Sequence, residues 1–331
     1  MSISVDKAAP SRILITGVTG FVGGYLAERC RVWYPQAKVF GLYNRKVPQQ
    51  VSAAMEHIIF LRADITQAED MHQALARSRP DVIFHLAAQS SVSASWSDPV
   101  QALQVNALGT LRLLEAARLE HPTARLVLVG SGEQYGAIQP HENPIHEEIR
   151  LRPINPYAVS KAMQDLYGYQ YFVSYGLPTV RVRSFNHFGP RQSDAFVLAG
   201  FARQIALIEA GKAEPVVMVG NLQAKRDFLP VEDVVTAYLT LAEQGQPGEV
   251  YNVGSGHARS IGEILDLLLT FAKMPIRIRE DPARMRPVDI AILEADISRI
   301  QAHTDWEPTV SFEFALKEML DYWRAVVATT V

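Results

Sequence analysis

The chain has 331 residues, of which 48% are hydrophobic and 20% are charged, and its formal net charge at pH 7 is -3. This composition excludes a disordered or fibrous chain, and the charge gives no broad attraction to nucleic acid or an anionic membrane. The single cysteine, Cys30, cannot form an internal disulfide, and no cysteine/histidine cluster suggests a metal site. With no signal peptide before Ser11 and no apolar run of about 20 residues, we expect a cytoplasmic protein without nucleic-acid or membrane partners.

Short apolar runs alternate with helical patterns through the first half of the chain. Strands are expected at residues 12–16, 39–43, 58–63, 82–86, 126–129 and 180–184. Helices are expected directly after the first strand and at residues 68–77, 99–119 and 156–175. Continuous apolar strands that alternate with helices predict an α/β fold with a doubly wound parallel sheet of the Rossmann type.

The pattern loosens after about residue 192 and predicts a smaller α/β lobe. Strands are expected at residues 216–219 and 250–253, and helices at 196–209, 260–273 and 312–326. Ser260 and Glu263 have the spacing of a capping box at the start of the second of these helices. We therefore expect a dinucleotide-binding domain at residues 11–190 and a substrate-binding lobe at 191–331, an arrangement that allows the chain to cross between them.

A glycine motif, Thr16-Gly17-x-x-Gly20-x-x-Gly23, follows the first strand and opens a helix. Gly17 permits a tight turn, Gly20 lets the backbone approach a pyrophosphate, and Gly23 allows the helix to pack closely on the sheet. A glycine-rich turn without a ligand is the alternative. The strand–turn–helix context favours a dinucleotide site.

The residues after the second strand bear on the choice of cofactor. An acidic residue there would bind the adenosine ribose of NAD, whereas this chain has Asn44-Arg45-Lys46. A cation favours the 2′-phosphate of NADP, so NADP(H) is expected to be preferred and NAD(H) to remain possible. The alternative is that these cations are solvated loop charges. Asp64, after the third strand, is placed to bond the adenine edge.

Tyr157 and Lys161 are four residues apart on a predicted helix, so their side chains share one face. The lysine charge is expected to lower the pKa of the phenol, which could then donate a proton to a developing alkoxide. Ser131, at the end of the fifth strand, could hydrogen-bond the same oxygen. A surface helix pair is the alternative interpretation of the tyrosine and the lysine.

Taken together, these segments resemble the extended short-chain dehydrogenase/reductase family over nearly the whole chain. The matching segments are Thr16-Gly-x-x-Gly-x-x-Gly23, His85-Leu-Ala-Ala88, Asn106-x-x-Gly-Thr110, Ser131 and Tyr157-x-x-x-Lys161. The resemblance implies a Rossmann domain, a nucleotide-sugar-binding lobe and catalysis by Ser131, Tyr157 and Lys161. The expected cofactor-binding residues are Gly17, Thr19, Gly20, Phe21, Val22, Gly23, Asn44, Arg45, Asp64, Ile65, Leu86, Ala87, Ala88, Gln89, Asn106, Val129, Tyr157, Lys161 and His187.

Finer motifs are similar to those of the GDP-mannose 4,6-dehydratase group. They are Ser131-Gly-Glu-Gln-Tyr-Gly136, Phe185-Asn-His187, Gly220-Asn-Leu-Gln-Ala-Lys-Arg-Asp-Phe228 and Arg286-Pro-Val-Asp289. Asparagine can bond a sugar diphosphate, arginine can pair with the diphosphate or stack on a base, and aspartate can accept from ribose hydroxyls. For each residue alone, a structural role is an alternative. The expected substrate-binding residues are Ser91, Ser131, Glu133, Tyr157, Asn186, Phe196, Val197, Arg226, Arg286 and Asp289.

The dehydratase reaction, the reductase reaction, another reaction on a nucleotide sugar and one non-enzymatic role remain open. The dehydratase reaction needs a base at C5, which the resemblance assigns to Glu133 as a further catalytic residue. The reductase reaction delivers a hydride from NAD(P)H to the C4 ketone of GDP-4-dehydro-6-deoxy-D-mannose and gives a GDP-6-deoxyhexose, GDP-D-rhamnose. A dinucleotide-binding protein without catalysis would be expected to lose Ser131, Tyr157 or Lys161, and all three are present.

Three departures from the dehydratase pattern favour the reductase. Gly20-Phe-Val-Gly23 stands where dehydratases usually have Gly-Gln-Asp-Gly, and the loop after Tyr43 lacks their Arg-Arg-Ser-Ser extension. Asn186-His-Phe-Gly-Pro-Arg-Gln192 replaces their Asn-His-Glu-Ser-Pro-Arg-Arg, and Gly200 stands at their basic residue. The sequence therefore predicts a reductase that acts on a GDP-linked 4-keto-6-deoxy sugar.

Members of this family often form dimers through two long helices that make a four-helix bundle. The helices at residues 99–119 and 156–175 correspond to these two. Their apolar residues could equally belong to the core of one chain. The resemblance implies a homodimer.

Overall fold

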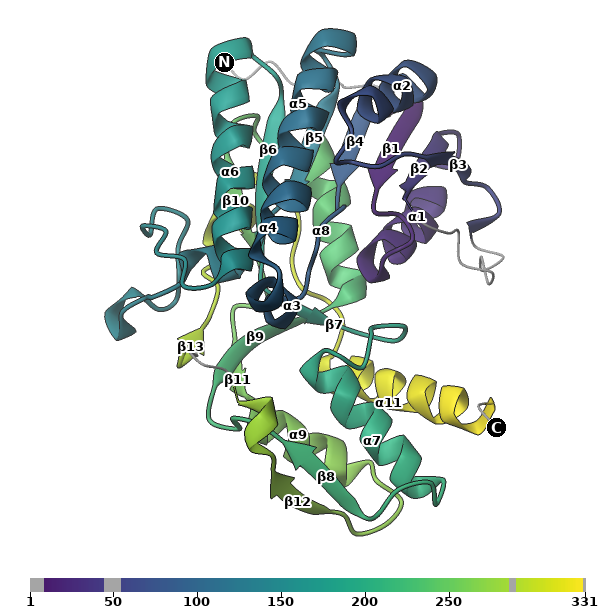
Figure 1. The fold of residues 1–331 in the computed structure, drawn as a ribbon, viewed down its shortest axis with the longest axis vertical. Helices are drawn as coiled ribbons and strands as arrows, with labels where there is room; N and C mark the ends of the chain where they lie inside the picture. Colours follow the sequence, from purple (N-terminus) through teal and green to yellow (C-terminus); the bar gives the residue numbers. More distant parts are fainter. Residues whose placement is uncertain (1–8, 45–54, 286–289, 330–331) are drawn as a thin grey trace.

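The computed structural model describes residues 9–44, 55–285 and 290–329. Its central element is a seven-stranded parallel sheet with the strand order β10-β6-β5-β4-β1-β2-β3 (Figure 1). The strands are β1 (Arg12–Thr16), β2 (Lys38–Tyr43), β3 (Ile59–Arg62), β4 (Val82–His85), β5 (Arg125–Val129), β6 (Thr179–Ser184) and β10 (Val250–Val253). The predicted Rossmann-type sheet is confirmed. The strand order reverses on either side of β1, and such a switch point opens a crevice at the carboxyl ends of the strands.

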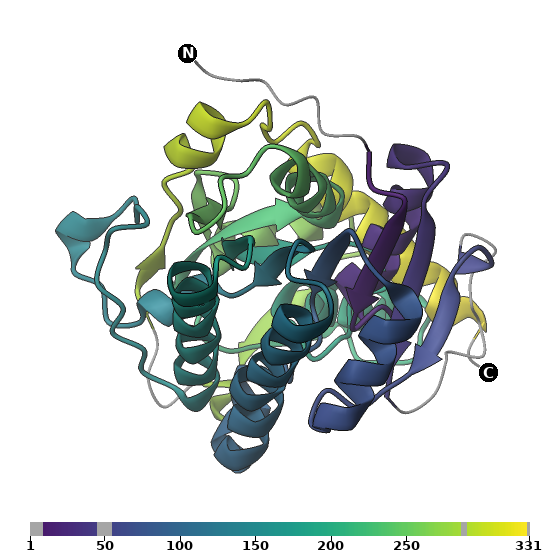
Figure 2. The ribbon, with the colours of Figure 1, turned by 90° about the horizontal axis from the view of Figure 1, so that it is seen from above.

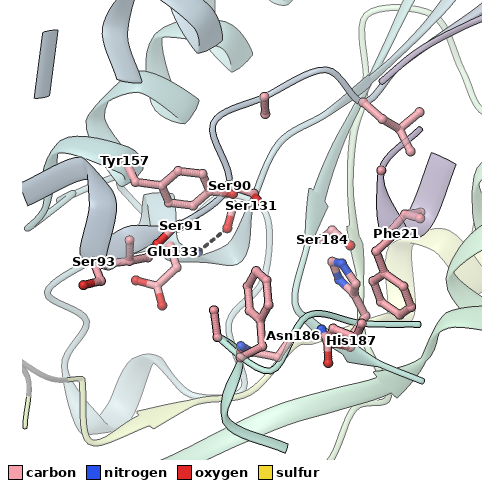
Figure 3. Close-up of a pocket in the computed structure, with 18 of the residues that line it drawn as sticks. Phe21, Ser90, Ser91, Ser93, Ser131, Glu133, Tyr157, Ser184, Asn186 and His187 are labelled. Atoms are coloured by element: carbon pink, nitrogen blue, oxygen red, sulfur yellow. Dashed lines mark hydrogen bonds between the residues drawn. The ribbon is translucent and has the colours of Figure 1, made fainter. Parts of the chain in front are cut away.

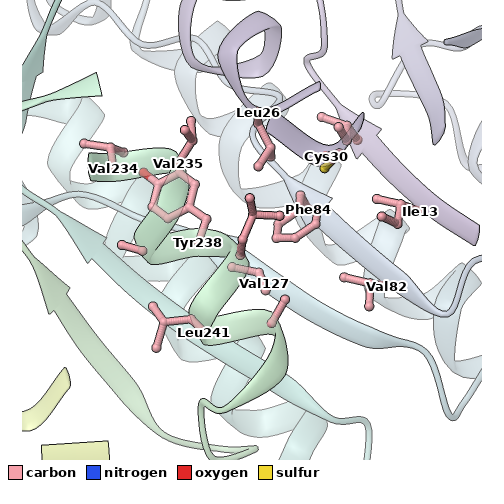
Figure 4. Packing of buried hydrophobic residues seen from close by; sticks show 14 of the residues in the cluster. Ile13, Leu26, Cys30, Val82, Phe84, Val127, Val234, Val235, Tyr238 and Leu241 are labelled. Carbon is pink, nitrogen blue, oxygen red and sulfur yellow. The ribbon is translucent and has the colours of Figure 1, made fainter. Parts of the chain in front are cut away.

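Helices cover both faces of this sheet, as Figure 2 shows from above. They are α1 (Phe21–Trp33) and α8 (Val231–Glu243) on one face, and α2 (Ala68–Ser78), α5 (Gly109–Glu120) and α6 (Pro156–Tyr175) on the other. Successive side chains of β1 point to opposite faces of the sheet and pack against the two helix layers in turn. Ile13 and Ile15 pack in one core with Leu26 of α1 and Val235 of α8 (Figure 4). Leu14 packs in the core on the opposite face.

Helix α8 and strand β10 belong to the second half of the chain but pack with the large sheet. Val234, Tyr238 and Leu241 of α8 are buried in the same core as Val127 and Val180 of β5 and β6. Strand β10 extends the sheet by pairing in parallel with β6. The chain therefore returns from the smaller lobe to the sheet. The division into domains at residue 190 stays a prediction.

The smaller lobe occupies the lower part of the molecule in Figure 1 and has its own apolar core. Its strands are β7 (Asn186–Phe188), β8 (Val216–Val219), β9 (Lys225–Pro230), β11 (Ala258–Ser260), β12 (Arg277–Glu280) and β13 (Ile292–Leu293). Its main helices are α7 (Val197–Glu209), α9 (Ile261–Thr270) and α11 (Phe312–Thr329). The predicted capping box is present: Ser260 Oγ accepts from the Glu263 amide at 3.1 Å, and Glu263 Oε2 accepts from the Ser260 amide at 2.7 Å.

Shorter elements connect these layers. They are α3 (Val92–Ser97), α4 (Pro99–Ala102), η2 (Leu103–Leu108), η3 (Gly132–Tyr135), η4 (Pro140–Glu142), η5 (Pro282–Arg284) and α10 (Ser298–His303). The single helix predicted at residues 99–119 is thus three segments, because η2 is a π-helical turn between α4 and α5. Within the described ranges, no helix has the length and apolar character needed to cross a membrane.

Helix α6 is attached to the sheet by a buried charge cluster. The Asp165 carboxylate of α6 forms ion pairs with two arginines of β6, with Arg183 Nη2 at 2.8 Å and with Arg181 Nη1 at 3.4 Å. Arg183 Nη1 also donates to the Tyr135 hydroxyl at 3.0 Å and to the Glu147 carbonyl at 2.9 Å. Two buried guanidinium groups therefore depend on one buried carboxylate for charge compensation.

We predict that Asp165→Asn lowers the free energy of unfolding by about 3–5 kcal/mol, because it removes the buried carboxylate that Arg181 and Arg183 share. Chemical denaturation would measure this. Asp266→Asn, at an exposed position of α9, is the matched control and should change stability by less than about 0.5 kcal/mol. Equal stability of the two variants would contradict the assigned role.

Candidate functional site

A cleft of about 870 Å³ lies between the carboxyl ends of the large sheet and the smaller lobe. It brings together most of the residues that the sequence predicts. Those lining it are Gly17, Thr19, Gly20, Phe21, Val22, Gly23, Asn44, Ile65, Leu86, Ala87, Ala88, Ser91, Val129, Ser131, Glu133, Tyr157, Lys161, Asn186, His187, Phe196, Val197 and Arg226. Arg45, Arg286 and Asp289 lie outside the described residues.

The glycine turn has the geometry that its motif requires. Gly17 has a φ of +71°, and a Cβ there would lie 2.8 Å from the Ala87 nitrogen. A Cβ on Gly23 would lie 2.2 Å from the Gly17 carbonyl oxygen. Helix α1 starts after Gly20, and no side chain in the described part of the protein caps it. Its first amide groups therefore suit a phosphate.

Three predicted cofactor-binding residues, Asp64, Gln89 and Asn106, are not among the described residues that line the cleft. Asp64 Oδ1 instead accepts from the amide and the hydroxyl of Thr66, at 2.8 and 2.7 Å. Asn106 is fully buried and pairs with the backbone of Gln89, with Oδ1 accepting at 2.8 Å and Nδ2 donating at 3.0 Å. Asn106 therefore positions the loop that starts at Gln89.

A buried hydrogen-bond chain joins the glycine turn to the neighbouring helix. Thr16 Oγ1 accepts from the amides of Leu86 and Ala87 at 3.1 and 3.0 Å, so its proton is directed to His85 Nδ1 at 2.8 Å. His85 Nε2 then donates to Thr110 Oγ1 at 2.8 Å, and Thr110 donates to the Asn106 carbonyl at 2.6 Å. Burial lowers the pKa of His85 to about 3, so the imidazole is neutral.

Tyr157 and Ser131 meet in the cleft (Figure 3). Burial raises the pKa of Tyr157 to about 12; a side-chain hydrogen bond with Ser131 opposes this rise, and the charge of Glu133 adds to it. The expected lowering of this pKa is therefore wrong for the protein by itself, because burial dominates. The phenol keeps its proton at neutral pH.

Lys161 lies one turn after Tyr157 on α6 and is buried. Its Nζ donates to the Val129 carbonyl at 2.7 Å and to Gln164 Oε1 at 2.8 Å. Burial lowers the pKa of this amine to about 7. At neutral pH the protonated and neutral forms of this lysine are therefore both populated.

Asn155 holds Glu133 near Tyr157. Its Oδ1 accepts from the Ala158 amide at 2.8 Å and caps α6, while its Nδ2 donates to Glu133 Oε2 at 3.3 Å. Sequence reasoning missed this residue. Asparagine followed by proline is a typical start of a helix and could have identified the cap.

The smaller lobe supplies the opposite wall of the cleft. Asn186 and His187 face the cleft from β7 (Figure 3), and the His187 ring stacks on Phe21 with centroids 6.1 Å apart. Phe196 and Val197 are exposed side chains at the start of α7. Arg226 is buried, and its Nη1 donates to the carbonyls of Lys225 and Ile290, at 2.8 and 2.6 Å. Polar, aromatic and cationic groups therefore converge on this side.

Several cleft residues were not predicted from the sequence. They are Ser90, Ser93, Trp96, Ser184, Asn221, Tyr238 and Arg284. The Tyr238 hydroxyl donates to Ser184 Oγ at 2.9 Å, which joins α8 to the end of β6. Trp96 ends the serine-rich segment Ser90-Ser-Val-Ser-Ala-Ser-Trp96, from which only Ser91 was predicted as a site residue.

The doubly wound sheet and a cleft with a serine, a tyrosine and a lysine at its carboxyl edge are those of an extended short-chain dehydrogenase/reductase. A family model described as GDP-mannose 4,6 dehydratase matches residues 14–319. The chain therefore belongs to this family of NAD(P)-dependent nucleotide-sugar enzymes, as its motifs predict.

Individual relatives include a reductase and an epimerase. The chain is 35% identical over 317 residues to the GDP-6-deoxy-D-mannose reductase of Pseudomonas aeruginosa, covering 96% of this chain and 98% of the relative. The structure of RMD from Pseudomonas aeruginosa complexed with NADPH matches with a TM-score of 0.81 and 33% identity, over 95% and 99% of the two chains. The UDP-glucose 4-epimerase of Thermus thermophilus in complex with NAD matches with a TM-score of 0.84 and 30% identity, over 97% and 100%.

We predict that the buried Lys161 makes the stability of the ligand-free protein rise with pH. The folded amine has a pKa of about 7 against 10.5 for an ordinary lysine, so between these values the unfolded chain holds one more proton. The destabilisation that the buried amine causes is greatest below pH 7 and decreases by about 1.4 kcal/mol per pH unit above it.

Chemical denaturation at pH 7 and pH 9, below the range of the tyrosines, would measure the effect. Relative to Lys161→Met, wild type should gain about 2–3 kcal/mol over these two units. Lys317→Met, at an exposed position of α11, should keep a constant difference from wild type. A constant difference for Lys161→Met as well would show that the amine is not shifted.

Proposed function

We propose that this protein reduces the C4 ketone of GDP-4-dehydro-6-deoxy-D-mannose to GDP-D-rhamnose with a reduced nicotinamide dinucleotide. The observation that carries the proposal is that Ser131, Tyr157 and Lys161 line one cleft, which continues to the glycine turn. Ketone reduction needs a proton donor such as the Tyr157 phenol. The 35% identity to a GDP-6-deoxy-D-mannose reductase over 96% of the chain supports the choice of substrate.

The residues of the cleft fit a nicotinamide dinucleotide. The glycine turn and the start of α1 would hold its pyrophosphate, and the backbone of Leu86, Ala87 and Ala88 would lie along it. When bound, the cofactor supplies the hydride for the ketone carbon. A preference for NADP(H) rests on Arg45, outside the described residues, and stays a prediction. The relatives solved with NADPH and with NAD support either form.

The chain's own residues deal with the ketone oxygen. The hydroxyls of Ser131 and Tyr157 converge where this oxygen would sit, and both can donate hydrogen bonds to it. As negative charge develops on the oxygen, Tyr157 gives up its proton. Lys161, with a pKa of about 7, can carry the positive charge that stabilises the resulting phenolate.

The smaller lobe is suited to the nucleotide part of the substrate. Asn186 and Arg226 offer donors for a diphosphate, and Phe196 and Val197 form an apolar wall for a base. Arg284 adds a second cation on the same side, paired with Asp281 at 3.2 Å. The proposed roles of Arg286 and Asp289 rest on sequence alone.

A dehydratase reaction is the second candidate. Glu133 lines the cleft, and its charge acts on the Tyr157 phenol, so a carboxylate base is available near the reacting atoms. The family model is itself described as a dehydratase. The departures at the glycine turn and after Asn186 favour the reductase. A non-catalytic dinucleotide-binding role would not explain why Ser131, Tyr157 and Lys161 line the same cleft.

We also propose that the protein forms a homodimer. Val159, Leu166, Tyr169 and Val173 are exposed on α6, at spacings that place them along one side of the helix. Val100, Leu103 and Leu119 are exposed on the adjoining segments α4, η2 and α5. Burying this apolar surface against the same surface of a second copy of the chain would stabilise a symmetric dimer. The expectation of a cytoplasmic location rests on the sequence.

We predict that Tyr157→Phe lowers kcat for ketone reduction by about 10²–10⁴-fold, because the proton donor is lost. NADPH affinity should stay within about twofold, since the ring and its packing remain. Absorbance of the reduced nicotinamide would measure turnover, and direct titration would measure affinity. Tyr169→Phe, at an exposed position of the same helix, is the control and should retain full turnover. A Tyr157 variant with more than half of wild-type activity would refute the assignment.

Glu133→Gln separates the two candidate reactions. A reductase breaks no carbon–hydrogen bond at C5, so this variant should reduce the ketone within about 100-fold of wild type, because only a few hydrogen bonds of about 0.5–1.5 kcal/mol each are weakened. Wild type given GDP-mannose and NADP⁺ should form no 4-keto-6-deoxy product. Formation of that product at a rate comparable to ketone reduction would make Glu133 a catalytic base and the protein a dehydratase.

A further inference from the structure

Trp96 differs from the other three tryptophans. Trp306 and Trp323 are buried, with exposed fractions of 3% and 9%, and Trp33 of α1 donates its indole N–H to Glu243 at 2.9 Å. Trp96 has an exposed fraction of 48% and lines the cleft. A large aromatic side chain left in water inside a ligand cleft is typical of a surface that a ligand covers.

The helix that carries Trp96 is fixed on both sides. Ser91 Oγ caps α3 by accepting from the Ala94 amide at 3.1 Å. Ser95 is fully buried; its hydroxyl donates to the Val92 carbonyl at 2.7 Å and accepts from the Tyr157 amide at 3.1 Å. The backbone that carries the indole is therefore set directly against the first turn of α6. A ring held in this way loses little conformational freedom when a ligand covers it.

Polar residues line the cleft around the start of α3, the helix that carries Trp96. Ser90, Ser91, Ser93 and Glu133 lie together on one side of the cleft in Figure 3, next to Tyr157 and opposite Asn186. Their hydroxyl and carboxylate oxygens suit the hydroxyl groups of a hexose. A 6-deoxyhexose also has a methyl group at C6, which needs an apolar surface. Trp96 of α3 is a large aromatic side chain among the described residues that line the cleft.

We propose that Trp96 is a specificity-determining residue whose indole receives the C6 methyl group of the hexose, so that the cleft prefers a 6-deoxy sugar to its 6-hydroxy counterpart. The inference deepens the proposed function and rests on it for the identity of the sugar. A contact of one methyl group with an apolar surface discriminates by about 10–200-fold. The preference should therefore be measurable in binding alone, without turnover.

Calorimetric titration of wild type, Trp96→Ala and Trp33→Phe with GDP-D-rhamnose, GDP-mannose and GDP tests the proposal. Wild type and the control Trp33→Phe should bind GDP-D-rhamnose at least about tenfold more tightly than GDP-mannose. In Trp96→Ala this ratio should approach one, while the affinities for GDP and NADPH stay within about twofold. An unchanged ratio, or an equal loss for GDP, would overturn the proposal.

Tryptophan fluorescence gives a second readout that does not require the alanine variant to fold. Emission of wild type should change with GDP-D-rhamnose but not with GDP, and Trp96→Phe should abolish that change. The same change in emission with GDP alone, or a change that persists in Trp96→Phe, would contradict the proposed contact between Trp96 and the sugar. The ketone-reduction assay stands apart from both: an inactive wild type that still prefers GDP-D-rhamnose would reject the reductase and retain the role of Trp96.

Discussion

The first turns of helix α6 are the reference point for the whole cleft. Hydrogen bonds from three separate segments converge there: Ser95 accepts from the Tyr157 amide, Asn155 caps the helix, and Asn106 Nδ2 donates to Ser160 Oγ at 2.9 Å. Each of these residues has a second partner, which is the α3 turn, Glu133 or the Gln89 loop, respectively. The residues proposed to bind the sugar and the proposed proton donor are thus held in one rigid frame.

The electrostatics of this frame follow from burial rather than from ion pairing. Burial keeps the Tyr157 phenol protonated and brings the pKa of Lys161 down to about 7, while His85 stays neutral within its threonine pair. At neutral pH the charge of this buried site therefore depends on the protonation of Lys161. In the proposed reaction, charge that develops on the ketone oxygen would be stabilised by groups already placed around it, with little competition from water.

The sheet strands and the glycine turn could be predicted because apolar runs and glycine spacing are local properties of the sequence. Motif and position also predicted Ser131, Tyr157 and Lys161, which line the cleft, whereas their catalytic roles stay a proposal. Other features depend on contacts that no local pattern encodes. The partners of Asn106 lie 17 and 54 residues away, so its structural role was missed, and burial reversed the expected pKa shift of Tyr157. Trp96 was not predicted as a site residue, because its place in the cleft depends on the packing of α3 against α6.

The large sheet is complete only when α8 and β10, from the second half of the chain, have packed on it. Val127 and Val180 have their covering helix only when residues 231–243 have been made, and β6 gains its outer neighbour only with residues 250–253. A nascent chain that stops at residue 190 would leave an apolar sheet face and a strand edge bare. During synthesis on the ribosome, the first half must therefore wait, partly folded, while the loops and strands of the smaller lobe emerge, and a gene fragment that encodes it alone would yield an aggregation-prone product.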